Sequence, residues 1–235
     1  MTESKKWVAK DGIGFVELLE VFGDDRTVVN AARVSFAKEV TEMRPADAKL
    51  IKYLAEHDHI SPFFHPQARF RIKMPIFVAR EWYRHTIGFA RNEVSRRYVD
   101  TAPECWLPSV SEIRARDARL KQGSKAEAAT DADVWHDLIH DVQNICCDAY
   151  QRLLDGGVAP EVARCILPQS MYTEFIETGS LAAYARLCGL RLGADAQVEI
   201  REFAQAVTNL LAPQFPVAWP ALVSSADAVP PSDAK

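Results

Sequence analysis

The chain has 235 residues, of which 48% are hydrophobic and 26% are charged, a composition typical of a soluble globular protein. Its 28 basic and 32 acidic residues give a net charge of −4, which excludes a protein that binds nucleic acid over its whole surface. Any anion site therefore has to be local. No apolar run approaches the roughly 20 residues that span a bilayer, and the first residues lack the apolar stretch of a secretory signal. We therefore expect a cytoplasmic protein with no membrane and no nucleic-acid partner.

The N-terminal part of the chain predicts one strand followed by two helices. An apolar stretch over residues 13–22 indicates the strand. Asp24 or Asp25 can then act as the N-cap of a helix over residues 28–36. Apolar residues at helical spacing predict the second helix over residues 46–57.

The next part changes from turn to strand to helix. Prolines interrupt residues 57–66, which predicts a connector without regular structure. Residues 68–74 alternate apolar and basic side chains, a strand pattern. Pro75 suits the first position of a helix that continues to residue 85 and has to break near Gly88.

Residues 92–100 (NEVSRRYVD) have strand character. In an extended chain, Glu93, Ser95 and Arg97 would point to one face. A row that carries an acceptor, a hydroxyl and a guanidinium suits a polar ligand better than a hydrophobic core.

Helices dominate the C-terminal half. Residues 108–132 are polar and rich in Gly, Ser and Ala, which predicts a mobile insertion or a frayed helix. The expected elements after it are a helix over 133–154, a helix from Pro160 to Pro168, a strand over 171–179, a helix that begins at Gly179 or Ser180 and ends near Leu192, and a helix over 196–211 capped by Asp195. We expect the residues after 223 to form a disordered tail.

Residues 84–98 (RHTIGFARNEVSRRY) gather positive charge directly after an apolar segment. The arginines that offer forked donors to phosphate or carboxylate oxygens are Arg84, Arg91, Arg96 and Arg97. The alternative is a solvated surface with a few salt bridges. The interleaved asparagine, glutamate and serine favour a ligand site.

The histidines raise the alternative of a metal site. The candidates are His57, His59 and His65 beside Ser61, and the i,i+4 pair His136 and His140. No carboxylate or cysteine completes a ligand set at recognisable spacing, so no metal is predicted. The five cysteines contain one adjacent pair and no CxxC spacing, so we expect small core residues and neither disulfides nor a zinc cluster.

Two further arginines lie among apolar neighbours and therefore need a partner. Arg164 lies in ARCILP, and Arg191 ends LAAYARLCGLR. A structural carboxylate and a bound anion are both possible partners. Glycine-rich phosphate loops of the GxxxxGK[ST] and GxGxxG types are absent from the sequence.

Several segments together resemble the flavin-dependent thymidylate synthases. That family has a signature of the form RHR, seven residues and serine, usually ending NExSxRY, and residues 84–98 are similar to it. Further matches, in the same order along the chain, are AARVSF (31–36), HISPFFH (59–65), PIFVAREWYRH (75–85), ARCILPQSMYTEF (163–175) and LRLGADAQVEIREFA (190–204). The resemblance covers most of residues 13–222.

The sequence departs from the family pattern mainly on the flavin side. Thr86 stands at the third position of RHR, and eight residues instead of seven separate it from the serine. We predict that Arg91, in the longer loop, supplies the missing charge. Ala182 and Asp195 stand where many members have arginine and histidine, while Phe64 and Glu81 replace glutamate and glutamine.

The resemblance implies an α+β fold in which an antiparallel sheet packs with long helices. It implies a single catalytic domain of the flavin-dependent thymidylate synthase type over residues 1–222, with residues 108–132 as a polar insertion and 223–235 as a disordered tail. The implied reaction is the reductive methylation of dUMP to dTMP, in which NADPH reduces FAD and methylenetetrahydrofolate supplies the carbon. Family members are homotetramers, so the resemblance also implies dUMP, folate and further copies of the chain as partners.

The resemblance also assigns residues. The implied substrate-binding residues are Glu81, Arg84, Glu93, Ser95, Arg96, Arg97, Arg164 and Arg191. The implied flavin-binding residues are His59, Ser61, Arg84, His85, Thr86, Ile87, Arg91, Asn92, Glu93, Ser180 and Arg186. Arg191 and Ser95 are the predicted catalytic residues. Arg191 would stabilise charge at the pyrimidine, and Ser95 would hold the substrate without acting as a nucleophile, since no base lies at an evident spacing.

Two other interpretations stay open from the sequence. One is a flavin- or nucleotide-binding homologue that has lost synthase activity, for which the changes at Thr86 and Asp195 would account. The other is a metal-dependent nucleotide hydrolase that uses the histidines named above.

Overall fold

The computed structural model describes residues 5–99, 101–117 and 123–226. The chain divides into two compact units, and each is considered by itself. The first comprises Met1–Ile72, Glu81–Asn92 and Ile176–Lys235, and the second comprises Lys73–Arg80 and Glu93–Phe175.

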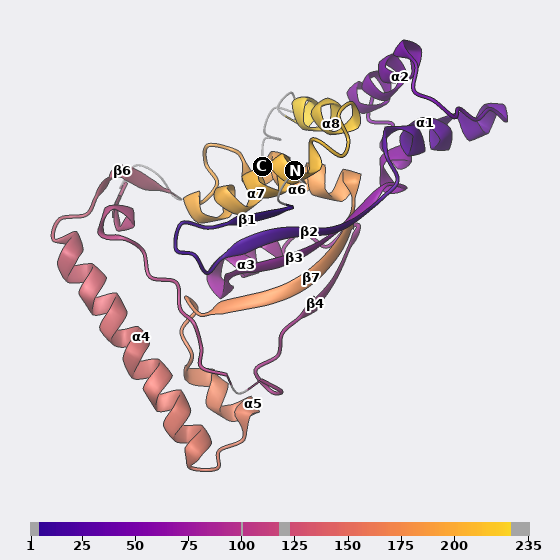
Figure 1. The fold of residues 1–235 in the computed structure, drawn as a ribbon. Helices are drawn as coiled ribbons and strands as arrows, with labels where there is room; N and C mark the ends of the chain where they lie inside the picture. Colours follow the sequence, from indigo (N-terminus) through magenta and orange to yellow (C-terminus); the bar gives the residue numbers. More distant parts are fainter. Residues whose placement is uncertain (1–4, 100, 118–122, 227–235) are drawn as a thin grey trace, which may run out of the picture. The chain divides into compact units, whose positions relative to one another are not determined.

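The elements are mixed α and β (Figure 1). The strands are β1 (Lys6–Val8), β2 (Phe15–Phe22), β3 (Gln67–Pro75), β4 (Phe89–Glu93), β5 (Arg114–Arg116), β6 (Ser124–Ala128) and β7 (Tyr172–Ser180). The α-helices are α1 (Asp25–Arg33), α2 (Pro45–Glu56), α3 (Ile76–Trp82), α4 (Ala132–Asp155), α5 (Pro160–Ala163), α6 (Leu181–Arg191), α7 (Val198–Leu211) and α8 (Ala218–Ala226). Short 3₁₀ turns are η1 (Val34–Phe36), η2 (Ser61–Phe64), η3 (Val110–Glu112) and η4 (Arg164–Ile166).

The main sheet has five strands in the order β1-β2-β3-β7-β4. β1 and β2 pair antiparallel, with Trp7 opposite Val16. In β3, Phe70 and Ile72 are fully buried and the intervening basic residues are more exposed. The predicted alternation over residues 68–74 is thereby confirmed, and the predicted class of an antiparallel α+β fold is correct.

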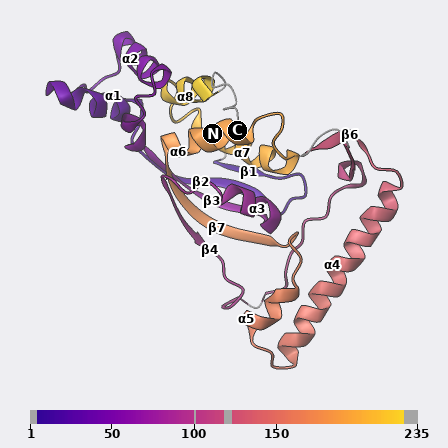
Figure 2. The ribbon, with the colours of Figure 1, turned by 180° about the vertical axis from the view of Figure 1, so that it is seen from behind.

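Helices of the first unit cover its hydrophobic core. α7 packs on β2, and α6 packs against α7 and α8 (Figures 1 and 2). α6 is apolar on nearly all sides, as expected for a helix in the interior, and its largest fully buried residues are Leu181, Tyr184 and Leu187. Ser180 begins this helix by accepting a hydrogen bond from the Ala183 amide at 3.2 Å, which confirms the predicted start.

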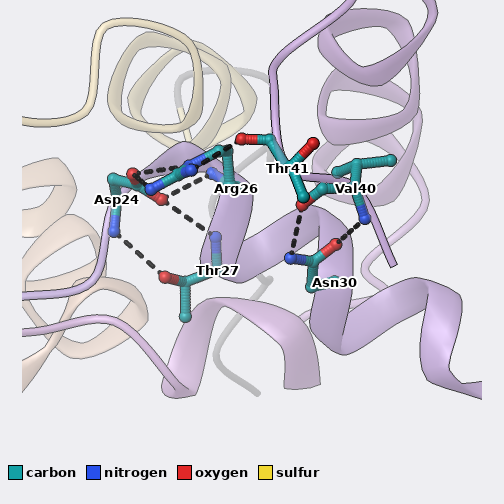
Figure 3. A network of polar contacts seen from close by, with 6 residues as sticks. All are labelled: Asp24, Arg26, Thr27, Asn30, Val40 and Thr41. Atoms are coloured by element: carbon teal, nitrogen blue, oxygen red, sulfur yellow. Dashed lines mark hydrogen bonds and ion pairs between the residues drawn. The ribbon is translucent and has the colours of Figure 1, made fainter. Parts of the chain in front are cut away.

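Polar side chains fasten α1 and the segment that follows it (Figure 3). Asp24 caps α1 by accepting from the amides of Arg26 and Thr27, and its own amide donates to the Thr27 hydroxyl at 3.1 Å. Asn30 accepts from the Val40 amide at 2.8 Å and donates to the Val40 carbonyl at 3.1 Å. The cap predicted at Asp24 or Asp25 is therefore Asp24, and Asn30 folds the following segment back onto the helix.

Asp25, the residue after this cap, binds the start of α8 within the first unit. Its carboxylate accepts from the amides of Val217 and Ala218 at 2.8 and 2.9 Å, at the start of α8. Burial raises the pKa of Asp25, and the two amide donors act in the opposite direction. One acidic side chain thus joins two helices that are far apart in the sequence.

The second unit contains the long helix α4, the predicted helix over 133–154. Its inner face buries Gln143 and Tyr150. Gln143 donates to the Trp106 carbonyl at 2.8 Å and to the Ser170 hydroxyl at 2.9 Å, so α4 is bound to two connecting segments.

Several predicted boundaries and elements are wrong. Pro75 ends β3 and does not start α3, which stops at Trp82. A frayed helix was one expectation for residues 108–132. The described residues of this segment instead form η3 and the antiparallel strands β5 and β6. Residues 118–122 lie outside the described residues. Asp195 makes no cap, since α7 begins after Gln197.

The predicted tail also starts too early. α8 extends through residues 224–226, while 227–235 lie outside the described residues. No helix in the described ranges is both long enough and apolar enough to cross a membrane.

Candidate active site

Arg191 is the centre of a polar cluster in the first unit. It ends α6, and its Nη1 donates to Oε1 of Glu81 at 2.5 Å. Its Nε donates to Nε2 of His85 at 3.0 Å. The side chains of Arg191 and Glu81 are only 20% and 27% exposed, so the ion pair is partly desolvated. The carboxylate expected as one possible partner of Arg191 is Glu81.

His85 is uncharged at neutral pH in this cluster. Burial, and after it the nearby charges of Arg191, Arg186 and Arg91, together lower its pKa to about 4. Because Nε2 accepts a hydrogen bond from Arg191, the ring proton belongs on Nδ1. A neutral histidine thus orients the arginine without competing with it for anions.

Arg91 lies against a buried acid. Its Nε donates to Glu177, whose side chain is fully buried and also accepts from Trp82 Nε1 at 3.2 Å. The Arg91 guanidinium lies 4.7 Å from the ring centroid of Phe89 and 5.3 Å from that of Tyr83. Burial raises the pKa of Glu177, and the Arg91 charge counteracts that shift.

The other predicted flavin-side residues of the first unit lie mostly on its surface. Those that are exposed are His59, Ser61, Arg84, Thr86, Ile87, Asn92 and Arg186. Ser180 is buried as the cap of α6. Gly88 has φ +82°, and a Cβ there would come within 2.9 Å of Ala183 Cβ and 3.0 Å of Ser180 Oγ. The loop after His85 therefore packs closely on the start of α6, which only glycine allows at this position.

The second unit contains a cavity of about 820 Å³. The predicted residues that line it are Glu93, Ser95, Arg96 and Arg164. Glu93 accepts from the Thr173 hydroxyl at 2.6 Å, and the Val94 amide donates to the Glu174 carbonyl at 2.9 Å. Two guanidinium groups and a hydroxyl in one cavity can bind a phosphate.

The predicted strand over residues 92–100 is wrong, and this changes which side chains share a face. β4 ends at Glu93, and a turn follows in which the Tyr98 amide donates to the Ser95 carbonyl at 3.0 Å. Consecutive residues Ser95 and Arg96 therefore line the cavity together. Arg97 is exposed, is not among the lining residues, and lies over the Tyr98 ring.

Arg164 is exposed and not buried among its apolar neighbours. Its Nε donates to the Glu161 carbonyl at 3.4 Å, a weak contact that leaves the guanidinium available to the cavity. A buried partner is therefore not needed there, in contrast to Arg191.

Sequence reasoning missed two groups of residues. Lys73 and Glu104 line the cavity and form an ion pair at 2.5 Å. Strand alternation places Lys73 on the polar face of β3, but nothing in the sequence indicates that this residue lines a cavity. Glu177 was missed as well; an acid at a buried position of an alternating strand is the signal that identifies it.

The histidines do not support the metal interpretation. Among the described residues, no group of three or more His, Cys, Asp or Glu side chains lies close enough to hold a metal ion. His57 and His59 instead lie against the Tyr53 ring.

The α+β scaffold thus carries an arginine-containing cavity in one unit and an arginine–histidine–glutamate cluster in the other, and both are suited to anionic ligands. A family described as "Thymidylate synthase complementing protein" matches residues 17–217. The chain belongs to this family of flavin-dependent thymidylate synthases, as its sequence motifs predict.

Individual relatives agree with this assignment. A flavin-dependent thymidylate synthase of Kosmotoga olearia is 41% identical over 216 residues, which are 91% of each chain. The corresponding enzyme of Thermus thermophilus is 41% identical over 208 residues, covering 88% of this chain and 75% of the relative. The crystal structure of a UMP/dUMP methylase, PolB of Streptomyces cacaoi, bound with 5-Br dUMP, has a TM-score of 0.79 and 30% identity, and covers 89% of this chain and 94% of that one.

Proposed function

We propose that the chain catalyses the reductive methylation of dUMP to dTMP, with methylenetetrahydrofolate as carbon donor, NADPH as reductant and FAD as bound cofactor. The observation that carries the proposal is the cavity in which Ser95, Arg96 and Arg164 converge, in a chain whose relatives are named flavin-dependent thymidylate synthases. The similarity to a methylase bound with 5-Br dUMP supports a deoxyuridine nucleotide as the substrate.

The proposed substrate-binding residues differ in charge and in hydrogen-bonding capacity. Ser95, Arg96 and Arg164 bind the dUMP phosphate, and Glu93 lines the pocket beside them. The family resemblance also assigns Arg84 and Arg97, both exposed, to the substrate. Ser95 acts by holding the substrate and not as a nucleophile.

Arg191 binds the carbonyl edge of the pyrimidine and stabilises negative charge as C5 becomes nucleophilic. Glu81 and His85 hold its guanidinium in one orientation, through contacts of 2.5 and 3.0 Å. Since His85 is neutral, its Nε2 accepts the hydrogen bond from Arg191 and adds no second charge beside the guanidinium.

The residues of the first unit fit a flavin nucleotide. Arg84 and Arg186 are exposed and, among the described residues, form no ion pair, so both can bind the diphosphate. The buried Nη2 of Arg91 has no hydrogen-bond partner within the described ranges, which leaves one donor for the cofactor. The remaining proposed contacts come from His59, Ser61, His85, Thr86, Ile87, Asn92, Glu93 and Ser180. When bound, the flavin supplies the relay of the one-carbon unit and the hydride.

We also propose that the enzyme is a homotetramer. α4 exposes Val134, Leu138, Val142 and Ile145, which follow each other at helical spacing and are each about half exposed or more. An apolar stripe of this kind on a surface helix is typical of a buried interface.

The deciding experiment is an anaerobic assay with dUMP, methylenetetrahydrofolate, FAD and NADPH, in which dTMP is measured. Flavin absorbance of the purified protein and dUMP binding are measured on the same sample. Binding of flavin and dUMP without dTMP would identify an inactive homologue, which the changes at Thr86 and Asp195 favour as the second candidate. Stoichiometric metal without flavin would contradict both.

A further inference from the structure

Two cysteines of the second unit approach each other although they are 42 positions apart. The Sγ atoms of Cys105 and Cys147 lie 3.9 Å apart, and both residues are half-buried. Cys147 lies on the inner face of α4, one turn after Gln143. Cys105 forms an isolated antiparallel bridge with Met171, a residue that lines the cavity.

We propose that Cys105 and Cys147 are an oxidation site, at which a hydroperoxide converts the two thiols into a disulfide that ties α4 to the wall of the arginine-containing cavity.

Hydrogen bonds hold the backbone on either side of the two cysteines in place. The Trp106 amide donates to the Ser170 carbonyl at 2.8 Å, and the Tyr172 amide donates to the Glu104 carbonyl at 2.8 Å, one on each side of Cys105. On α4, Gln143 contacts the carbonyl of Trp106, the residue next to Cys105. The backbone on both sides is therefore fixed, and rotation of the side chains is the movement that brings the sulfurs to the bonding distance of about 2.05 Å.

The reaction balances with a hydroperoxide as the oxidant. The Cys147 sulfur attacks one peroxide oxygen, the O–O bond breaks, and the leaving hydroxide takes up the thiol proton as water. The Cys105 sulfur then attacks the Cys147 sulfenic acid, an S–S bond forms, the S–O bond breaks, and the Cys105 proton leaves with the hydroxide as a second water. Two thiols and one hydrogen peroxide thus give one disulfide and two waters.

The order of the two cysteines follows from their surroundings. Burial, together with the neighbouring Cys147, raises the pKa of Cys105 to about 12, so Cys105 stays a thiol at neutral pH. Cys105 is therefore the second sulfur to react, and the closure step should accelerate with pH.

The disulfide would act on the cavity through one short segment. Glu104 lines the cavity next to Cys105 and pairs with Lys73, another lining residue. A covalent link from α4 to Cys105 fixes this wall in place.

The test treats the purified full-length chain with hydrogen peroxide at pH 7 and pH 9 and maps disulfides by non-reducing peptide mass spectrometry. We expect a peptide pair linked through Cys105 and Cys147, formed faster at pH 9, with a mass lower by about 2 Da and reversed by dithiothreitol. Because the link closes a long loop, we expect the melting temperature of the oxidised chain to rise by roughly 5 °C or more.

Two single variants and one control separate the possible outcomes. Cys105→Ser and Cys147→Ser should each abolish the linked peptide, so one of them suffices should the other fold poorly. The neighbouring thiol provides the control, since Cys146→Ser should leave the link and the shift in melting temperature intact. A link through Cys146, links between chains, or oxidation confined to the exposed Cys165 would overturn the proposal.

Discussion

The pair of Arg91 and Glu177 gives the sharpest prediction, because its two members respond differently to the loss of the partner. Glu177 is fully buried and Arg91 is 15% exposed. Removal of one member of a buried ion pair costs about 3–5 kcal/mol when the other charge stays in place. Arginine cannot lose its proton, whereas a buried glutamate can gain one.

Glu177→Gln should therefore be the more damaging single change. It leaves a permanent charge next to a neutral amide, and we expect a loss of about 3 kcal/mol of unfolding free energy, which corresponds to a melting temperature lower by roughly 6–12 °C. Arg91→Met should lower the free energy of unfolding by less, about 1–2 kcal/mol, because Glu177 can gain a proton and become neutral. That smaller loss should shrink as the pH falls, since the pKa of Glu177, already raised by burial, rises further without the arginine.

The double variant Arg91→Met/Glu177→Gln should recover most of the loss, to within about 1 kcal/mol of the unmodified chain, because neither charge is left unpaired. The assay is thermal unfolding of all four proteins at pH 5, 7 and 8, with flavin affinity measured by titration. Since the proposed flavin contact of Arg91 is a charged hydrogen bond worth about 1.5–3 kcal/mol, the stable double variant should bind flavin roughly tenfold or more weakly.

A matched control is the surface pair of Arg69 and Glu20, whose side chains are 43% and 66% exposed. Arg69→Met should change stability by less than about 1 kcal/mol. A double variant as unstable as Glu177→Gln would refute the desolvation reasoning. A stable double variant with unchanged flavin affinity would show that Arg91 only anchors the loop.

Three other predictions concern single groups. Arg191→Ala should lower kcat at least about 100-fold while bound flavin absorbance persists, and loss of the flavin would instead place this arginine on the cofactor. The pKa of His85 in the folded chain is about 4, below its ordinary value of 6.5. As the pH falls from 6.5 to 4, the unfolded chain therefore binds a proton that the folded chain does not bind, and the free energy of unfolding decreases over this range. With allowance for solvent screening of a partly exposed ring, the loss should be about 1–2 kcal/mol, and His85→Gln should remove it from the pH profile of unfolding; an unchanged profile would contradict the shift. Asp25→Ala removes two amide contacts at the start of α8 and should cost about 1–2 kcal/mol in urea unfolding, whereas Asp24→Glu, at the neighbouring exposed cap, should cost less.

The sequence by itself determined those features that depend on neighbours in the chain. The alternation of residues 68–74 identified a strand, the spacing over 133–154 identified a long helix, and Ser180 identified the start of α6, because periodicity and capping are local properties. The ordered motifs also gave the family and hence the reaction, without any knowledge of distances.

Tertiary structure decided which groups meet. Arg91 is 86 positions from Glu177, and Arg191 is 110 positions from Glu81, so no local pattern could pair them. A turn after β4, and not the expected strand, brought Ser95 to the same cavity as its neighbour. The two ion pairs have a common physical reason: desolvation makes a buried charge require a partner, but only the packing of helices and strands determines which partner lies within reach.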